Sequence, residues 1–136
     1  MNKCDFEPTY LEITDREDVA VVAFRVPFLS EDYNLEQLGH ELFVLVEQCG
    51  CRRLVVSLRD IQYTTSSGLG KLITLHRKLH RLGGQVAFCD LRPRILETMQ
   101  MSKLDTYFQI TPDVETAVAA VSACEPDRIT TASRPC

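Results

Sequence analysis

The residues Ile61-Gln62-Tyr63-Thr64-Thr65-Ser66-Ser67-Gly68-Leu69-Gly70 join a short apolar run to a long amphipathic segment. The apolar run, Arg53 to Leu58, is nearly continuous, which is typical of a strand covered on both faces in a parallel sheet. A helix is predicted to begin at Ser66 or Ser67, because serine is among the best residues at a helix start. The stretch therefore predicts a central strand, a polar connection, and a helix whose first turn carries a hydroxyl.

This helix is predicted to run to about Leu82, where Gly83-Gly84 provides a stop. At helical spacing the leucines share one side, and polar, mostly basic residues share the other. The apolar side contains Leu69, Leu72, Leu75, Leu79 and Leu82, and the basic side contains Lys71, Thr74, Arg77, Lys78 and Arg81. We expect the first side to face the core. The second is interpreted as a solvated face, with contact to an acidic partner or a phosphate as the functional alternative.

Toward the N-terminus, residues 10–14 and 19–26 read as two strands joined by a polar turn, and Pro27 ends the second strand. Asn34, with Gln37 three residues later, is predicted to cap a first helix that finishes near Gly50.

Toward the C-terminus, residues 85–89 read as a strand, and Pro93 fits the first position of a third helix. Residues 107–110 are short enough for an edge strand, and Thr111-Pro112-Asp113 is predicted to start a last helix through Val121. This order of elements predicts an α/β fold with a mixed sheet.

Size and composition indicate one domain with the amino-acid composition of an ordinary globular protein. The chain has 136 residues, of which 45% are hydrophobic and 25% charged, and we expect no membrane span and no secretory signal. The predicted domain covers residues 9–122, between an N-terminal extension (1–8) and a disordered C-terminal tail (123–136). The net charge of -4 opposes a nucleic-acid partner, so a protein partner in the cytoplasm is the expectation.

The cysteines show no C-x-x-C spacing and are interpreted as free thiols rather than as a disulfide framework or a metal site. They are Cys4, Cys49, Cys51, Cys89, Cys124 and Cys136.

The layout of a buried strand, a polar segment and Ser-Ser-Gly-Leu-Gly opening a helix is similar to the motif of the STAS family. The family is named for sulfate transporters and anti-sigma factor antagonists. The likeness spans about Tyr10 to Val121 and continues through residues 75–79, Gly83-Gly84, Arg92-Pro93-Arg94 and residues 104–108. Family members that are phosphorylated usually carry Asp where this chain has Thr65. The resemblance implies a mixed central sheet with about four helices packed mainly on one face.

The resemblance also implies a function and a site. Ser66 corresponds to the serine that a partner kinase phosphorylates, with Ser67 and Thr65 as less favoured acceptors. The dephosphorylated form binds a serine kinase that is also an anti-sigma factor, phosphorylation releases it, and a phosphatase is a further expected partner. The implied partner-binding residues are Thr64, Thr65, Ser66, Ser67, Gly68, Leu69 and Lys71. Gly68 and Gly70 keep the first turn free of bulk for an approaching kinase.

Other interpretations stand beside this one. Ser66 and Ser67 could simply cap the helix, and the domain could be an unmodified scaffold or transport-accessory module that binds partners constitutively. An enzyme would need convergent acid, base or metal groups, and the sequence shows no such set. His76 and His80 have a zinc-compatible spacing but lack the H-E-x-x-H glutamate and an evident third ligand. We expect no catalytic residue, metal or cofactor, and the oligomeric state stays open.

Overall fold

The computed structural model describes residues 8–16 and 19–123 of the chain. Its main sheet has five strands in the order β1-β2-β4-β6-β7. These are β1 (Leu11–Arg16), β2 (Val19–Phe24), β4 (Arg53–Ser57), β6 (Gln85–Cys89) and β7 (Gln109–Thr111). β1 and β2 form the predicted antiparallel hairpin, and the other neighbouring pairs are parallel. β4 lies at the centre, as its unbroken apolar sequence predicts.

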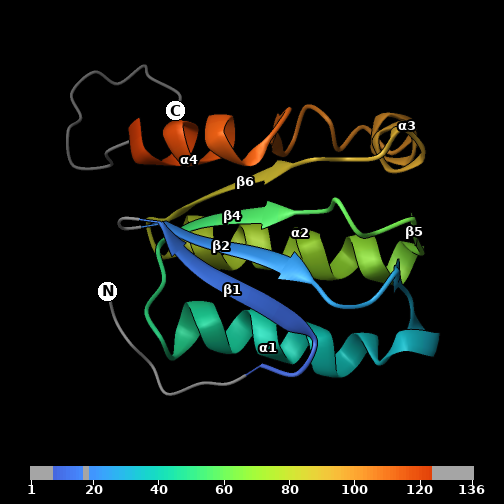
Figure 1. The fold of residues 1–136 in the computed structure, drawn as a ribbon, viewed down its shortest axis with the longest axis horizontal. Coiled ribbons are helices and arrows are strands. Elements are labelled where there is room, and N and C mark those ends of the chain that lie inside the picture. The colour runs from blue at the N-terminus through green and yellow to red at the C-terminus, as the bar shows by residue number, and fades with distance from the viewer. Residues whose placement is uncertain (1–7, 17–18, 124–136) are drawn as a thin grey trace.

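The helices cover both faces of this sheet. The two longest, α1 (Leu35–Glu47) and α2 (Ser66–Arg81), lie side by side on one face, and α4 (Val114–Ala123) covers the other (Figure 1). α3 (Pro93–Met101) lies at the end of the molecule to which the parallel strands point. The expected mixed sheet with four helices is confirmed, and the structure adds that α4 stands alone on its face.

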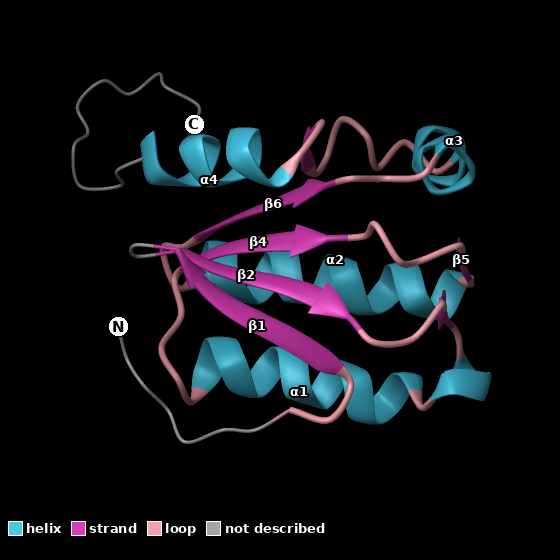
Figure 2. Ribbon diagram, viewed as in Figure 1, coloured by secondary structure: helices cyan, strands magenta, loops and turns pink. Residues whose placement is uncertain are grey.

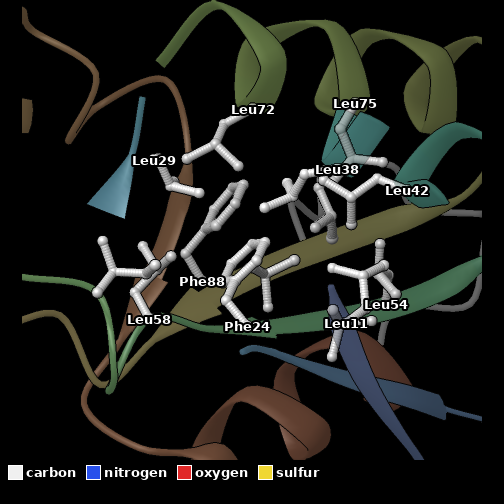
Figure 3. Close-up of a cluster of buried hydrophobic side chains, with 14 of the residues drawn as sticks. Leu11, Phe24, Leu29, Leu38, Leu42, Leu54, Leu58, Leu72, Leu75 and Phe88 are labelled. Carbon is white, nitrogen blue, oxygen red and sulfur yellow. The ribbon is translucent and has the colours of Figure 1, made fainter. Parts of the chain in front are cut away.

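Successive side chains of a strand point to opposite faces of the sheet, so the core has two parts. Val22 and Val56 point toward α1 and α2, whereas Val21 and Val55 point toward α4. The larger core is shown in Figure 3, where Phe88 and leucines of the sheet meet leucines of α1 and α2. Complete burial of one such side chain contributes about 1.5–3 kcal/mol, so this layer holds α2 firmly in place.

A second, two-stranded sheet was not predicted from the sequence. β3 (Phe28–Leu29) pairs in parallel with β5 (Tyr63–Thr64), and the short 3-10 helix η1 (Glu31–Tyr33) follows β3 directly. In Figure 2 this pair lies beyond the arrowheads of the main sheet, beside the start of α2. The pair therefore builds the end of the molecule where the Ser-Ser-Gly-Leu-Gly motif begins its helix.

Several details differ from the sequence predictions. Asn34 occupies the predicted N-cap position of α1, but it follows η1 with a left-handed backbone (φ 55°) and its side chain makes no capping hydrogen bond. The last strand begins at Gln109 rather than Tyr107, since Tyr107 and Phe108 close a turn onto Leu104. Cys51 and Cys89 have free thiols, but Cys49 is disulfide-bonded, so the free-thiol prediction is wrong at that residue.

The predicted N-terminal extension and C-terminal tail lie outside the described residues, apart from Pro8 and Ala123. The bounds of the domain, 9–122, stay a prediction. Within the described ranges, no helix combines the length and the apolar character needed to cross a membrane.

Candidate functional site

The start of α2 is capped by Thr65. Its backbone is extended (φ -91°, ψ 175°), and its hydroxyl oxygen accepts a hydrogen bond from the Gly68 N–H at 3.2 Å. The same hydroxyl lies 3.3 Å from the Leu29 carbonyl oxygen, which also accepts the Thr65 N–H at 3.0 Å. Threonine therefore fills the capping position without the Asp that phosphorylated members of the resembling family usually carry there.

Ser66 and Ser67 are consequently the first two residues of the helix and not its cap. Both are exposed. Among the described residues, no acceptor pairs with their backbone N–H groups, which point out of the helix end together with the positive end of its dipole. The simple capping interpretation of these serines is therefore wrong, because Thr65 performs that task.

A carboxylate from another element lies at this helix start. The pKa of Glu31 in η1 lies below its usual range, and hydrogen bonding with the Ser67 side chain is the main cause. This contact could not be predicted from the sequence, because it depends on the pairing of β3 with β5.

The two glycines of the motif differ in their surroundings. A Cβ at Gly68 would lie 2.4 Å from Thr64 Oγ1, 2.6 Å from the Leu29 carbonyl oxygen and 2.9 Å from Leu29 Cβ. A Cβ at Gly70 would meet nothing within 4 Å among the described residues. Gly68 is therefore required by the close packing of α2 on the small sheet, whereas Gly70 leaves open surface.

The other predicted partner-binding residues divide between surface and interior. Thr64 and Leu69 are buried, like Gly68, so they shape the site from below. Lys71 is part-buried, and its ammonium group forms an ion pair with Glu36 of α1 at 3.1 Å. Of the seven residues, the structure places Ser66 and Ser67 at the surface and Thr65 and Lys71 at its margin.

The predicted basic face of α2 is partly used inside the fold. Lys78 pairs with Glu47 of α1 at 2.7 Å and lies 5.2 Å from the centre of the Phe43 ring. Arg77 and Arg81 are exposed. The face is therefore less positive than the sequence suggests, because two of its lysines bind α1.

Aromatic side chains lie beside the helix start and were missed as site residues. Phe28 packs edge-on against Tyr33 and Tyr63, with ring centres 5.2 and 6.3 Å apart. Tyr63 is 45% exposed although its backbone belongs to β5. Tyrosine is one of the residues enriched at the hot spots of protein interfaces.

His76 and His80 stack on α2, with ring centres 6.1 Å apart. His76 also packs on Tyr107 and Phe108, and both burial and the neighbouring His80 lower its pKa. No group of three or more metal-ligating side chains occurs in the described part of the chain.

Comparison with known proteins gives consistent matches. A model of the STAS domain matches residues 10–117. The chain is 31% identical over 115 residues to the anti-sigma F factor antagonist of Paenibacillus polymyxa, covering 85% of this chain and 96% of that protein. A solved anti-sigma factor antagonist from Mycobacterium paratuberculosis superposes with a TM-score of 0.73, at 21% identity, over 82% and 92% of the two chains. The Bacillus cell fate determinant SpoIIAA, in its phosphorylated form, superposes with a TM-score of 0.62, at 17% identity, over 82% and 98%.

Proposed function

Because the chain belongs to the STAS domain family, we propose that it acts as an anti-sigma factor antagonist controlled by phosphorylation of Ser66. In this role the unphosphorylated protein binds a serine kinase that is also an anti-sigma factor. That kinase transfers the γ-phosphoryl group of ATP to Ser66 Oγ, and ADP and the hydroxyl proton leave. A phosphatase restores the hydroxyl by hydrolysis with release of inorganic phosphate. The catalytic steps belong to the partners, and this chain supplies the modified residue.

The proposal rests on the observation that Ser66 does not cap the helix. Thr65 satisfies the Gly68 N–H, and the Ser66 hydroxyl is exposed and makes no hydrogen bond within the described residues. An acceptor hydroxyl must be reachable and free to lose its proton. Ser66 meets both conditions without any change in the fold.

Phosphorylation at this position is compatible with an intact domain. A phosphate adds roughly -1.5 to -2 charge, and the dipole and unpaired N–H groups of α2 favour that charge. The leucines beneath the helix, including Leu69 and Leu72, are buried, whereas Ser66 is exposed. We therefore expect the modification to alter the surface offered to the partner and to leave the core unchanged.

The proposed partner surface combines the exposed serines, the open surface at Gly70 and the exposed ring of Tyr63. Such a surface places an aromatic anchor next to the modifiable hydroxyl, so one added phosphate lies inside the contact area. Desolvating a phosphate in an interface without a counter-charge is costly, which accounts for release of the partner. A cytoplasmic location is part of the proposal, because ATP and sigma factors are found there.

The test uses the anti-sigma kinase of the same host with ATP, and the wild-type chain, Ser66→Ala, Ser67→Ala and Ser66→Asp. We expect the wild type and Ser67→Ala to be labelled, Ser66→Ala to remain unlabelled, and Ser66→Asp to bind the kinase at least tenfold more weakly. Unlabelled wild type, or label confined to the C-terminal threonines, would refute the proposal. Binding that ignores the charge at residue 66 would instead favour a constitutive scaffold.

A further inference from the structure

The hydroxyl of Thr65 joins the first turn of α2 to the small sheet. Its oxygen accepts the Gly68 N–H at 3.2 Å, and its proton is donated to the carbonyl oxygen of Leu29, the last residue of β3, at 3.3 Å. A threonine hydroxyl has a single proton to donate, so this bond uses it. The side chain of Thr65 therefore makes one hydrogen bond within its own helix and one to a residue 36 positions away in the chain.

This connection lies directly beside Ser66. β3 and β5 pair over only two residues each. The Thr65 N–H donates to the same Leu29 carbonyl oxygen at 3.0 Å, so the backbone and the side chain of one residue extend this short pairing into α2. Ser66 is the next residue and begins the helix, and Tyr63 of β5 presents its exposed ring two residues before Thr65. Thr65 therefore fixes the position of the proposed acceptor relative to the aromatic ring beside it.

From these bonds we infer that Thr65 is a positioning residue for the phosphorylation of Ser66. The inference rests on the proposed function and adds to it a residue that acts through the helix start. In the transfer, Ser66 Oγ bonds to the γ-phosphorus of ATP, the bond from that phosphorus to the bridging oxygen of ADP breaks, and the hydroxyl proton passes to the kinase. Thr65 takes no part in this exchange, because its own proton is donated to Leu29. It holds the first turn of α2 in place, so that the Ser66 oxygen lies in line with the bond that breaks.

The two hydrogen bonds require different properties of the side chain at residue 65. Serine has the same hydroxyl and can make both. Aspartate accepts the Gly68 N–H and suits the positive end of the helix dipole, but its carboxylate has no proton for the Leu29 carbonyl oxygen and would place two acceptors side by side. Valine has the shape of threonine and makes neither bond. Capping therefore needs only an acceptor at residue 65, whereas positioning needs a hydroxyl, and the Asp of phosphorylated family members cannot replace Thr65 in this chain.

The experiment measures single-turnover phosphorylation of the full-length chain, with the host anti-sigma kinase in excess and ATP, and maps the phosphate by mass spectrometry. It compares wild type with Thr65→Ser, Thr65→Asp and Thr65→Val. The rate on Ser66 at saturating kinase should stay within about twofold of wild type in Thr65→Ser, and should fall about fivefold or more in Thr65→Asp and Thr65→Val, because one hydrogen bond that positions the acceptor is lost. The kinase concentration that gives half of the saturated rate should change little, since Tyr63 and the open surface at Gly70 are intact.

The saturated rate separates positioning from mere stabilisation of the fold. Loss of stability alone would raise the kinase concentration needed for half of that rate and leave the saturated rate unchanged, because binding draws the chain into its folded form. That pattern, a Thr65→Asp variant labelled as fast as wild type, or a Thr65→Ser variant as slow as Thr65→Val would overturn this inference while the proposed function stands. Wild type without label on Ser66 would overturn the proposed function, and the inference with it.

Discussion

Gly68→Ala and its matched control Gly70→Ala test how an added methyl group changes the stability of the protein. Gly68 is packed against the small sheet, whereas Gly70 faces open surface. Both glycines lie in the first two turns of α2, so both changes add one methyl group to the same helix. At Gly68 the methyl group would lie within 3.0 Å of three atoms, one of them the Leu29 carbonyl oxygen. That oxygen is fixed because it accepts hydrogen bonds from the N–H and the hydroxyl of Thr65.

The magnitudes follow from these contacts. Overpacking a buried site costs about 1–3 kcal/mol, and the higher value applies because a backbone atom is among the contacts. Alanine in place of glycine in a helix recovers about 1 kcal/mol, which leaves a net loss of about 2 kcal/mol for Gly68→Ala. Gly70→Ala has no opposing contact and should gain about 0.5–1 kcal/mol.

The assay is urea unfolding followed by circular dichroism, with thermal melting as a second measure. At about 3–4 °C per kcal/mol for a domain of this size, Tm should fall about 6–8 °C in Gly68→Ala and rise about 2–4 °C in Gly70→Ala. The slope with urea should be unchanged in both, since neither variant alters the surface exposed on unfolding. A Gly68→Ala protein as stable as wild type would refute the close packing of α2 on the small sheet.

Three further predictions concern stability. Thr65→Ala should lower the free energy of unfolding by about 1 kcal/mol, because the capping hydrogen bond is lost. Thr65→Ser should retain most of the capping stabilisation, and equal losses for the two variants in urea unfolding would contradict capping by the hydroxyl. Glu41→Gln should cost about 1–3 kcal/mol in the same assay, because this buried carboxylate accepts the N–H groups of Thr9 and Tyr10 at 2.8 and 2.9 Å, and an unchanged midpoint would exclude that role. Burial lowers the pKa of His76, so the unfolded chain takes up a proton at a higher pH than the folded protein does, and Tm should fall as the pH drops below about 6.5. His76→Leu should reduce this fall in Tm. An identical pH profile of Tm in the variant would show that His76 is not its source.

The main sheet could be predicted because its strands carry strong local patterns. The continuous apolar run before Leu58 identified β4. The leucine spacing of α2 identified its buried face at Leu72, Leu75 and Leu79, but not at Leu82, which follows the helix and is exposed. These signals depend only on burial along one element, so the sequence by itself contains them.

The small sheet and η1 could not be predicted in the same way. β3 and β5 contain two residues each, too few for any periodic signal, and their pairing joins Leu29 to Thr64 across the whole of α1 and β4. The capping role of Thr65 and the contact of Glu31 with Ser67 both depend on that long-range pairing. Asn34 precedes α1 at the predicted position, but its side chain makes no capping bond, because η1 occupies the turn before α1 and Asn34 leaves it with a left-handed backbone.

The start of α2 at Ser66 was predicted from the sequence, but the contacts around it were not. The motif pointed to the start of α2, where the structure shows the exposed Ser66 and Ser67. The hydrogen bonds made by the hydroxyls of residues 65–67 depend on neighbouring residues in β3 and η1. The pairing of Lys71 and Lys78 with α1 is likewise a tertiary effect that the spacing of basic residues on α2 does not reveal.

A mass-spectrometric phosphosite map of the protein purified from its own host tests the central claim most directly. Our account predicts phosphate on Ser66, with Ser67 and Thr65 unmodified, and loss of all phosphate from this helix start in Ser66→Ala. A chain that carries no phosphate under any growth condition, or carries it only outside residues 65–67, would contradict the account.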